Sequence, residues 1–468
     1  MAEPAPRGRW GWWVLAALLP LAAGLTWLSV QFPVGRLAVW VWSIAGVAWA
    51  SAVAGGGPEA GQRRGLAAAL LVSAALLLVA PPRFSDDLWR YLFDGRVGAM
   101  GLNPFSYAPA NPKISWVAPE LVAQMNFPEM RTIYPPVAQG LFALVGLVGG
   151  GDRFWRLLLL VAAWAAAWLL GRSEADTGER ARLGWGIAAS PLVIVSAGSL
   201  GALDVTGLLV AAALLSETVR RRAALQGFWV GVGAGVKLFP AVLFWAVPSS
   251  RRLRSGLVAG SVAAAVLVAT YLPIAGIGSK ALGSLSTYSS VWRFNAGPVL
   301  WAAAAMERGL EAGGVGWSVE VPLPERLRDP ARRVVDGEPT SKLFLGRNEV
   351  ARAGATLVGL LVLAAALVVG RRRVADDAAL MALCLLAFYA TQFTVYPWYG
   401  LWLIPAAVQL RGRGWLGGAS LAWTGCLPLA LLTPAAVIDG GVWSEPIWVA
   451  PLLWGAVLWG GWASRNRV

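Results

Sequence analysis

The most constraining feature of this chain is a series of apolar runs, several of which approach or reach the roughly 20 residues that an α-helix needs to cross a bilayer. The runs do not alternate apolar and polar residues with a period of two, as strands of a membrane β-barrel do. Only 14% of the 468 residues are charged, whereas soluble domains carry about 25%. We therefore predict an all-α polytopic protein of the cell membrane, forming one domain over residues 1–468.

The positive charge of the chain lies mostly in short connections between these runs. The net charge is +14, and arginines cluster at residues 63–64, 220–222, 251–254, 371–373 and 411–413. Because clusters of this kind mark the cytoplasmic side of membrane proteins, they indicate topology and do not predict a nucleic-acid partner. The sequence contains no histidine, which excludes imidazole catalysis and most zinc sites. Cys384 and Cys426 both lie in apolar runs and predict no disulfide framework.

The runs and the basic connections together predict about 12 transmembrane helices with both termini in the cytoplasm. Residues 1–64 include an N-terminal helical hairpin, residues 82–135 form a large outer loop with short juxtamembrane helices, and residues 307–350 form a polar outer insertion. The insertion has eight acidic and seven basic residues and so lacks the cytoplasmic charge pattern.

Two segments are too short or too polar at both ends for a simple crossing. The apolar run after Pro136 has only about 14 residues, which predicts a half-span or a tilted juxtamembrane helix. The stretch 226–248 begins and ends beside cytoplasmic arginines, which predicts two half-helices that meet near Lys237 and Pro240. Broken helices in membranes normally line a cavity.

A polar stretch, residues 83–96, follows the third apolar run directly. Ser85 is suited to cap a helix, with Asp86 and Asp87 in its first turn, where the helix dipole favours negative charge. If that helix continues, Asp87, Arg90, Tyr91 and Asp94 share one face. One interpretation is a capped, solvated helix at the membrane edge; the other is a carboxylate held near the lipid boundary to deprotonate a hydroxyl group.

This stretch carries a family resemblance. Residues 85–96, followed by Gly101-Leu102-Asn103-Pro104-Phe105, resemble the first outer loop of bacterial GT-C glycosyltransferases, which are mannosyltransferase-like membrane enzymes that use polyprenyl-phosphate sugars. Three later segments fit the same pattern, at residues 132–136, 236–240 and 395–399. One position departs from it, because such enzymes often have histidine where this chain has Tyr396.

The resemblance implies a GT-C-like fold and transfer of a hexose, with mannose favoured, from a polyprenyl-phosphate donor to a hydroxyl of a glycan or glycolipid acceptor. Transfer would take place on the extracytoplasmic face, with inversion, and Asp86 and Asp87 match the family's acidic base. The chemistry of the residues agrees, because an inverting displacement by a sugar hydroxyl needs one carboxylate as base. We favour Asp87, since it shares a helix face with Arg90 and Asp94.

The leaving group in such a reaction is a phosphate, which needs positive charge more than an acid. Lys237 is the first candidate to bind it, because a lysine inside an apolar run costs about 2.5–3.5 kcal/mol on insertion scales; snorkelling to the interface is the alternative. Arg90 and Arg293 are the other phosphate candidates. The expected substrate contacts are Asp94, Arg131, Tyr134, Asn295, Tyr396, Trp398 and Tyr399, although solvated loops and interfacial aromatic belts are common alternatives.

Two further interpretations concern Asp204 and a metal. Asp204 precedes an apolar run, where N-terminal capping of a helix is the expected role. Asp86 and Asp87 offer carboxylates to Mg²⁺ or Mn²⁺, but two adjacent carboxylates alone are a weak signal, and we assign no metal ligands.

Two other classes of function remain open at this point. A flippase or transporter of lipid-linked glycans would suit broken helices and an intramembrane lysine, although no inverted repeat is visible. A glycan polymerase or ligase would differ from the hexosyltransferase only in the size of the donor head group.

Overall fold

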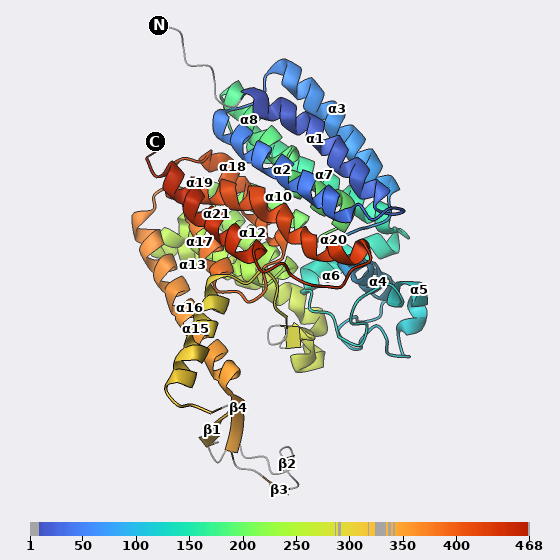
Figure 1. Cartoon of the computed structure of the whole chain (residues 1–468), viewed down its shortest axis with the longest axis vertical. Helices are drawn as coiled ribbons and strands as arrows, with labels where there is room; N and C mark the ends of the chain where they lie inside the picture. The colour runs from blue at the N-terminus through green and yellow to red at the C-terminus, as the bar shows by residue number, and fades with distance from the viewer. Residues whose placement is uncertain are drawn as a thin grey trace.

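Helices make up most of the structure, a computed structural model that describes residues 9–285, 287–288, 292–316, 318–322, 334–335, 338–339 and 342–466. The first three helices pack together, with α1 lying against both α2 and α3 (Figure 1). Their bounds are α1 Arg9–Leu28, α2 Gly35–Gly55 and α3 Ala60–Val79. This arrangement includes the hairpin expected from the first two apolar runs.

The outer loop expected at residues 82–135 contains short helices rather than a span. They are α4 Asp87–Ala99, a 3₁₀ turn Ser115–Val117 and α5 Pro119–Val122. The helix α6 Pro136–Leu147 follows and is short, as expected for the run after Pro136. The chain then continues through α7 Asp152–Arg172, α8 Thr177–Ala188, α9 Pro191–Val195, a π-helical turn Ser196–Leu200, α10 Val205–Leu215 and α11 Glu217–Arg220.

The second half of the chain alternates long helices with broken ones. Its first elements are α12 Ala223–Val236, the 3₁₀ helices Phe239–Ala246 and Pro248–Arg251, α13 Leu253–Tyr271, a 3₁₀ segment Leu272–Leu282, α15 Pro298–Ala312 and α16 Arg347–Arg373. Its last elements are α17 Asp377–Ala390, a 3₁₀ helix Pro397–Trp402, α18 Ile404–Leu410, α19 Gly414–Cys426, a 3₁₀ turn Leu427–Leu431, α20 Leu432–Ile438 and α21 Val449–Ser464.

Short strands occur only in the polar insertion, among the residues that the structure describes. β1 Ser318–Pro322 pairs antiparallel with β4 Lys342–Gly346, and β2 Val334–Val335 pairs with β3 Glu338–Pro339. They project from the helical body beyond α15 and α16 (Figure 1). The remaining residues of the 307–350 insertion, at 317, 323–333, 336–337 and 340–341, lie outside the described part of the chain.

Within the described ranges, seven helical segments are long and apolar enough to cross a membrane, and a bent pair of helices makes an eighth candidate. The seven are residues 10–28, 35–55, 60–79, 152–172, 253–278, 347–373 and 414–438. The predicted class, a helical polytopic membrane protein, agrees with this result. The larger number of about 12 crossings stays a prediction, because other apolar helices, such as α6, α10, α12 and α17, are shorter.

Helices end where prolines interrupt apolar runs. The helical stretch from residue 177 to residue 200 is divided into two pieces, α8 and the segment from Pro191 to Leu200, which are bent by 40°. Pro191 begins the second piece, because proline lacks a backbone N–H and suits only the first turn of a helix. The predicted break near Lys237 and Pro240 is confirmed: α12 ends at Val236, and a 3₁₀ helix starts at Phe239.

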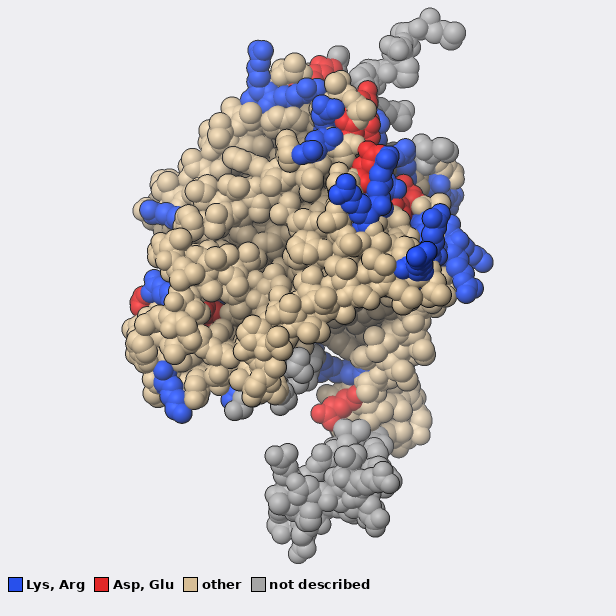
Figure 2. Space-filling model, turned by 180° about the vertical axis from the view of Figure 1, so that it is seen from behind, with Lys and Arg blue, Asp and Glu red and all other residues tan. Residues whose placement is uncertain are grey.

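The arginine-rich connections gather at one end of the molecule. Arg411 pairs with Glu179, while Arg220 and Arg251 both pair with Asp377. Figure 2 shows basic side chains concentrated at the top and upper right of the molecule, with some acidic ones among them. The loop that contains α4 and α5 lies at the other end (Figure 1). The fold therefore separates the basic connections from the acid pair.

Glycines allow α4 to lie directly on α6. A Cβ atom on Gly95 would come 2.3 Å from the carbonyl oxygen of Phe142, and one on Gly146 would come 2.3 Å from the carbonyl oxygen of Gly95. Small residues permit this kind of backbone approach between membrane helices. The contact fixes α4, and with it the acid pair at its start, against a neighbouring helix.

Candidate active site

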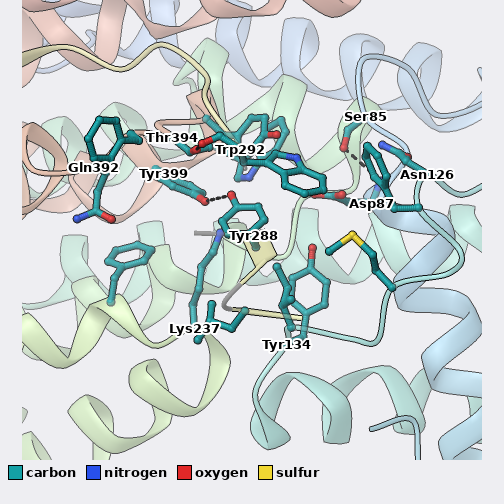
Figure 3. A pocket seen from close by; sticks show the side chains of 18 of the residues that line it. Ser85, Asp87, Asn126, Tyr134, Lys237, Tyr288, Trp292, Gln392, Thr394 and Tyr399 are labelled. Carbon is teal, nitrogen blue, oxygen red and sulfur yellow. Dashed lines mark hydrogen bonds between the residues drawn. The ribbon is translucent and has the colours of Figure 1, made fainter. Parts of the chain in front are cut away.

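A cavity of about 1090 Å³ lies at the end of the molecule away from the basic connections. Its lining comes mainly from the start of α4, the 125–135 segment, the break after α12, the first half of α16 and the segment 388–399, which begins in the last turn of α17. Figure 3 shows side chains from these separate segments pointing into one space, among them Asp87, Tyr134, Lys237 and Tyr399. Residues far apart in the chain thus form one polar and aromatic site.

The acid pair lies at the start of α4. The helix begins one residue later than predicted, with Asp86 and not Ser85 in the cap position. Its first residue is Asp87, and neither carboxylate makes a capping hydrogen bond. The Asp87 backbone N–H instead donates to Ser85 Oγ at 3.3 Å. Both carboxylates line the cavity. The interpretation of the pair as simple helix caps is therefore wrong.

The two carboxylates differ in their surroundings. Asp86 is exposed, whereas Asp87 is half-buried. Burial raises the pKa of Asp87 to about 6, while the positive charge of Lys237 opposes that rise and the negative charge of Asp86 adds to it. Partial loss of contact with water also raises the pKa of Asp86, although its side chain is the more exposed of the two. A carboxylate whose pKa lies near the working pH is well suited to act as a general base.

Two phenylalanines at the cavity have left-handed backbone conformations. Phe84 has φ of 69° and Phe127 has φ of 50°, a region that costs a residue with a Cβ about 1–2 kcal/mol. Phe84 directly precedes the acid pair, and the Phe127 ring contacts Trp292 edge to face, with centroids 4.7 Å apart. Strained backbone of this kind clusters at functional sites, where the surrounding structure holds it.

Lys237 lies at the helix break and forms a buried ion pair with Asp204. Its Nζ lies 2.8 and 3.0 Å from the two carboxylate oxygens, and Trp402 Nε1 donates to the same carboxylate at 2.9 Å. The Lys237 ammonium also lies 4.0 Å from the centroid of the Tyr399 ring. Lys237 therefore faces the cavity and does not snorkel to an interface.

Asp204 corrects one sequence-based interpretation. It occupies the cap position of α10, but its side chain makes no capping bond and is 1% exposed. The Lys237 pair requires this carboxylate inside the fold, because an unpaired buried ammonium is costly. Two lone charges of opposite sign in neighbouring apolar runs were the signal that could have predicted the pair.

Arg90 lines the cavity, but its guanidinium binds the loop that precedes α6. Its guanidinium donates to the carbonyl oxygens of Met130 and Phe127, both at 2.8 Å, and to that of Asn126 at 3.5 Å. These bonds tie the loop before α6 to α4. With its donors used in this way, Arg90 holds the wall of the cavity, and the geometry gives no support to the predicted phosphate contact.

Three predicted contact residues lie outside the cavity lining. Asp94 is 2% exposed and accepts a hydrogen bond from Gln139 Nε2 at 2.9 Å, which places it in the α4–α6 interface. Asn295 is also buried, and Arg293 is exposed beside the cavity without lining it. Helical periodicity placed Asp94 on the same face of α4 as Asp87, but α6 covers that face at Asp94.

The predicted aromatic residues and Arg131 do line the cavity. The Tyr396 and Trp398 rings stack with centroids 4.6 Å apart, and the Tyr399 hydroxyl lies 2.9 Å from that of Tyr288. Tyr134 donates to the Tyr91 hydroxyl at 3.3 Å. Further lining residues that sequence reasoning did not single out are Asn126, Phe127, Tyr288, Trp292, Arg352, Gln392 and Thr394.

Among the residues that the structure describes, no three or more acidic, cysteine or histidine side chains gather as a metal site. Asp87 and Asp204 are each near Lys237, which supplies the positive charge there. Comparisons with protein-family models, with curated proteins and with solved structures found no match to this chain.

Proposed function

We propose that the protein is an inverting glycosyltransferase that moves a hexose, with mannose as the first candidate, from a polyprenyl-phosphate donor to an acceptor hydroxyl. The observation that carries this proposal is the half-buried Asp87 carboxylate, which lines a cavity together with the Lys237 ammonium and has a pKa raised to about 6. The cavity has room for a sugar and part of its carrier.

The reaction follows from the chemistry of these groups. The acceptor hydroxyl transfers its proton to Asp87 as its oxygen attacks the anomeric carbon, and the bond from that carbon to the phosphate oxygen breaks on the opposite side. The phosphate leaves with the electron pair of the broken bond, and nearby positive charge stabilises it. Tyr396, Trp398 and Tyr399 offer rings on which a sugar or an isoprenoid unit stacks.

The proposal includes an orientation in the membrane and a fold family. The end rich in arginines would face the cytoplasm, because positive connections are retained there. The cavity, at the other end, would then open on the extracytoplasmic side. The resemblance of residues 85–96 to GT-C enzymes supports about 12 crossings in a GT-C-like arrangement, with the shorter apolar helices as the additional or partial spans.

The test uses membranes that contain the full chain and a panel of polyprenyl-phosphate sugars, with release of polyprenyl phosphate as the readout. Release with one sugar, lost in Asp87→Asn, would support the proposal. A chain that moves labelled lipid between leaflets without releasing polyprenyl phosphate would instead be a flippase. Full transfer activity in both Asp86→Asn and Asp87→Asn would refute the assignment of the base.

A further inference from the structure

The cations that line the cavity differ in what they already bind. Arg90 donates to three loop carbonyls, and Lys237 is paired with both oxygens of Asp204. Within the described residues, Arg352 and Arg131 line the same cavity and have neither an ion pair nor a side-chain hydrogen bond. The positive charge that is free to bind an anion in the cavity therefore belongs to Arg352 and Arg131, and not to Arg90 or Lys237.

Arg352 is built into the wall rather than extended into solvent. It lies in the second turn of α16, is half-buried, and places its guanidinium carbon 4.7 Å from the centroid of the Phe393 ring. A cation over an aromatic face is attracted by the ring and held in position. Thr356, one turn further along α16, and Gln392 line the same part of the cavity and supply neutral polar groups.

A second arginine lies close to Arg352. The segment that contains Arg293 pairs with the segment that contains Phe393: the Phe294 backbone N–H donates to the Phe393 carbonyl oxygen at 3.1 Å, and Thr394 Oγ1 donates to the Trp292 carbonyl oxygen at 2.9 Å. Arg293 is therefore next to the residue whose ring Arg352 contacts. Glu349 is a carboxylate that lines the same cavity, but it accepts the Gly346 backbone N–H at 2.8 Å in the cap of α16, and no ion pair joins it to Arg352 among the described residues. An anion bound at Arg352 in the cavity would also be attracted by the nearby positive charge of Arg293.

The surroundings of Arg352 select the kind of anion. The helix continues from Arg352 as an apolar segment suited to cross a membrane. Leu357, Leu360 and Leu361 on that segment are more than half exposed, and Leu360 also lines the cavity. The cavity therefore opens beside an apolar helix surface. Figure 2 shows a recess with basic and acidic side chains between the main body and the projecting helices.

We propose that Arg352, with Arg293 beside it, binds the phosphate of a lipid whose hydrocarbon chain lies along the apolar surface of α16. Arginine suits phosphate because its planar group donates two parallel hydrogen bonds. This subsite deepens the proposed function and rests on it for the identity of the lipid, the polyprenyl-phosphate carrier. In that arrangement Lys237 and Asp204 act near the sugar, and Arg352 anchors the carrier.

The test measures binding of polyprenyl phosphate to the full chain in nanodiscs of neutral lipid. Arg352→Gln should weaken binding roughly tenfold to a hundredfold, since hydrogen bonds to charged groups have that worth, and Arg352→Lys should recover part of the loss. The matched control is Arg372→Gln, an exposed arginine at the far end of the same helix. Unchanged binding in Arg352→Gln, or an equal loss in the control, would overturn the proposal.

Two further ligands identify the source of the phosphate. Neutral polyprenol should bind weakly and be insensitive to Arg352→Gln. Inorganic phosphate should compete only at concentrations far above those of polyprenyl phosphate; competition at similar concentrations would show a site for free phosphate and overturn the lipid assignment. Binding is measured without sugar transfer, so Arg352-dependent binding in a chain that transfers no sugar would refute the proposed function and leave this subsite standing.

Discussion

Two aspartates of α4, Asp87 at its start and Asp94 in its middle, have opposite surroundings. Asp94 is sealed between α4 and α6, and Gln139 bridges it to Thr132 through bonds of 2.9 and 2.8 Å. Asp87, two turns earlier, faces an open cavity, and its side chain makes no hydrogen bond among the described residues. Asp204 resembles Asp94, since Lys237 and Trp402 occupy both of its oxygens. A carboxylate whose oxygens already accept hydrogen bonds from the protein stabilises the fold, whereas a carboxylate without such bonds is free to accept a proton from a substrate.

The largest expected effect separates Asp87 from Asp94 by activity. Asp87→Asn should lower the turnover of sugar transfer by about 10²–10⁴-fold, the usual contribution of a general base, and leave folding intact. Rates of polyprenyl-phosphate release by the purified protein would measure it. Asp94→Asn is the matched control on the same helix, because its amide oxygen still accepts from Gln139. Equal losses of activity in both variants would show that Asp87 and Asp94 do not differ in role.

A large effect on stability is expected at the Lys237 pair. Lys237→Met leaves the Asp204 carboxylate buried without its cation, which should cost about 3–5 kcal/mol. The double variant Lys237→Met with Asp204→Asn should recover much of that loss, because the amide keeps an acceptor for Trp402. Thermal unfolding of all three proteins in one detergent gives the comparison. A double variant no more stable than Lys237→Met would show that the pair is not the source of the loss.

A smaller loss of stability is expected at Asp94, in the interface between α4 and α6. Asp94→Ala leaves the buried Gln139 amide without one acceptor, at a cost of about 1–3 kcal/mol. The fall in thermal midpoint should therefore be less than for Lys237→Met, and transfer activity per folded molecule should change little. If activity fell as steeply as in Asp87→Asn while the protein stayed folded, Asp94 would belong to the reacting groups.

The smallest effect concerns pH. The pKa of Asp87 is raised to about 6 by burial, and only the deprotonated form accepts a proton, so transfer should fall as pH decreases through about 6. The charge of Asp86 contributes to that rise, hence Asp86→Asn should move the acid limb to lower pH. The measurement is kcat/KM between pH 5 and 8. A limb that shifts to higher pH in Asp86→Asn would contradict the assignment.

The raised pKa of Asp87 also makes the stability of the folded protein depend on pH. The folded pKa of Asp87 lies above its ordinary value, so protonation favours the folded state, and that contribution is lost as pH rises from about 4 through about 6. Asp87→Asn should therefore be at least as stable as the unchanged protein at neutral pH. A marked loss of stability there would mean that Asp87 has a structural partner.

The local patterns of the chain predicted much of the site. Charge beside an apolar run located Asp86 and Asp87, and proline with lysine inside another run located the break at Lys237. These features depend only on residues that are close together in the sequence, so they can be recognised without the structure. The Asp204–Lys237 pair spans 33 residues, and the Arg90 bonds to the outer loop span about 40. The two lone opposite charges in neighbouring apolar runs hint at the Asp204–Lys237 pair, but no local pattern fixes its geometry or specifies the Arg90 bonds, since both depend on how the helices pack.

The sequence by itself determined that the chain forms apolar helices for a membrane, with its arginines in connecting loops and an acid pair at the start of a short helix. Hydropathy, charge and helix periodicity are properties of residues that are close in sequence, so they can be recognised without knowledge of the fold. Only the tertiary structure decided that Asp94 is sealed, that Asp204 neutralises Lys237 and that Arg352 faces the cavity with no described anionic partner. Those outcomes depend on which helix covers each side chain, and helix packing brings together residues that the sequence keeps apart.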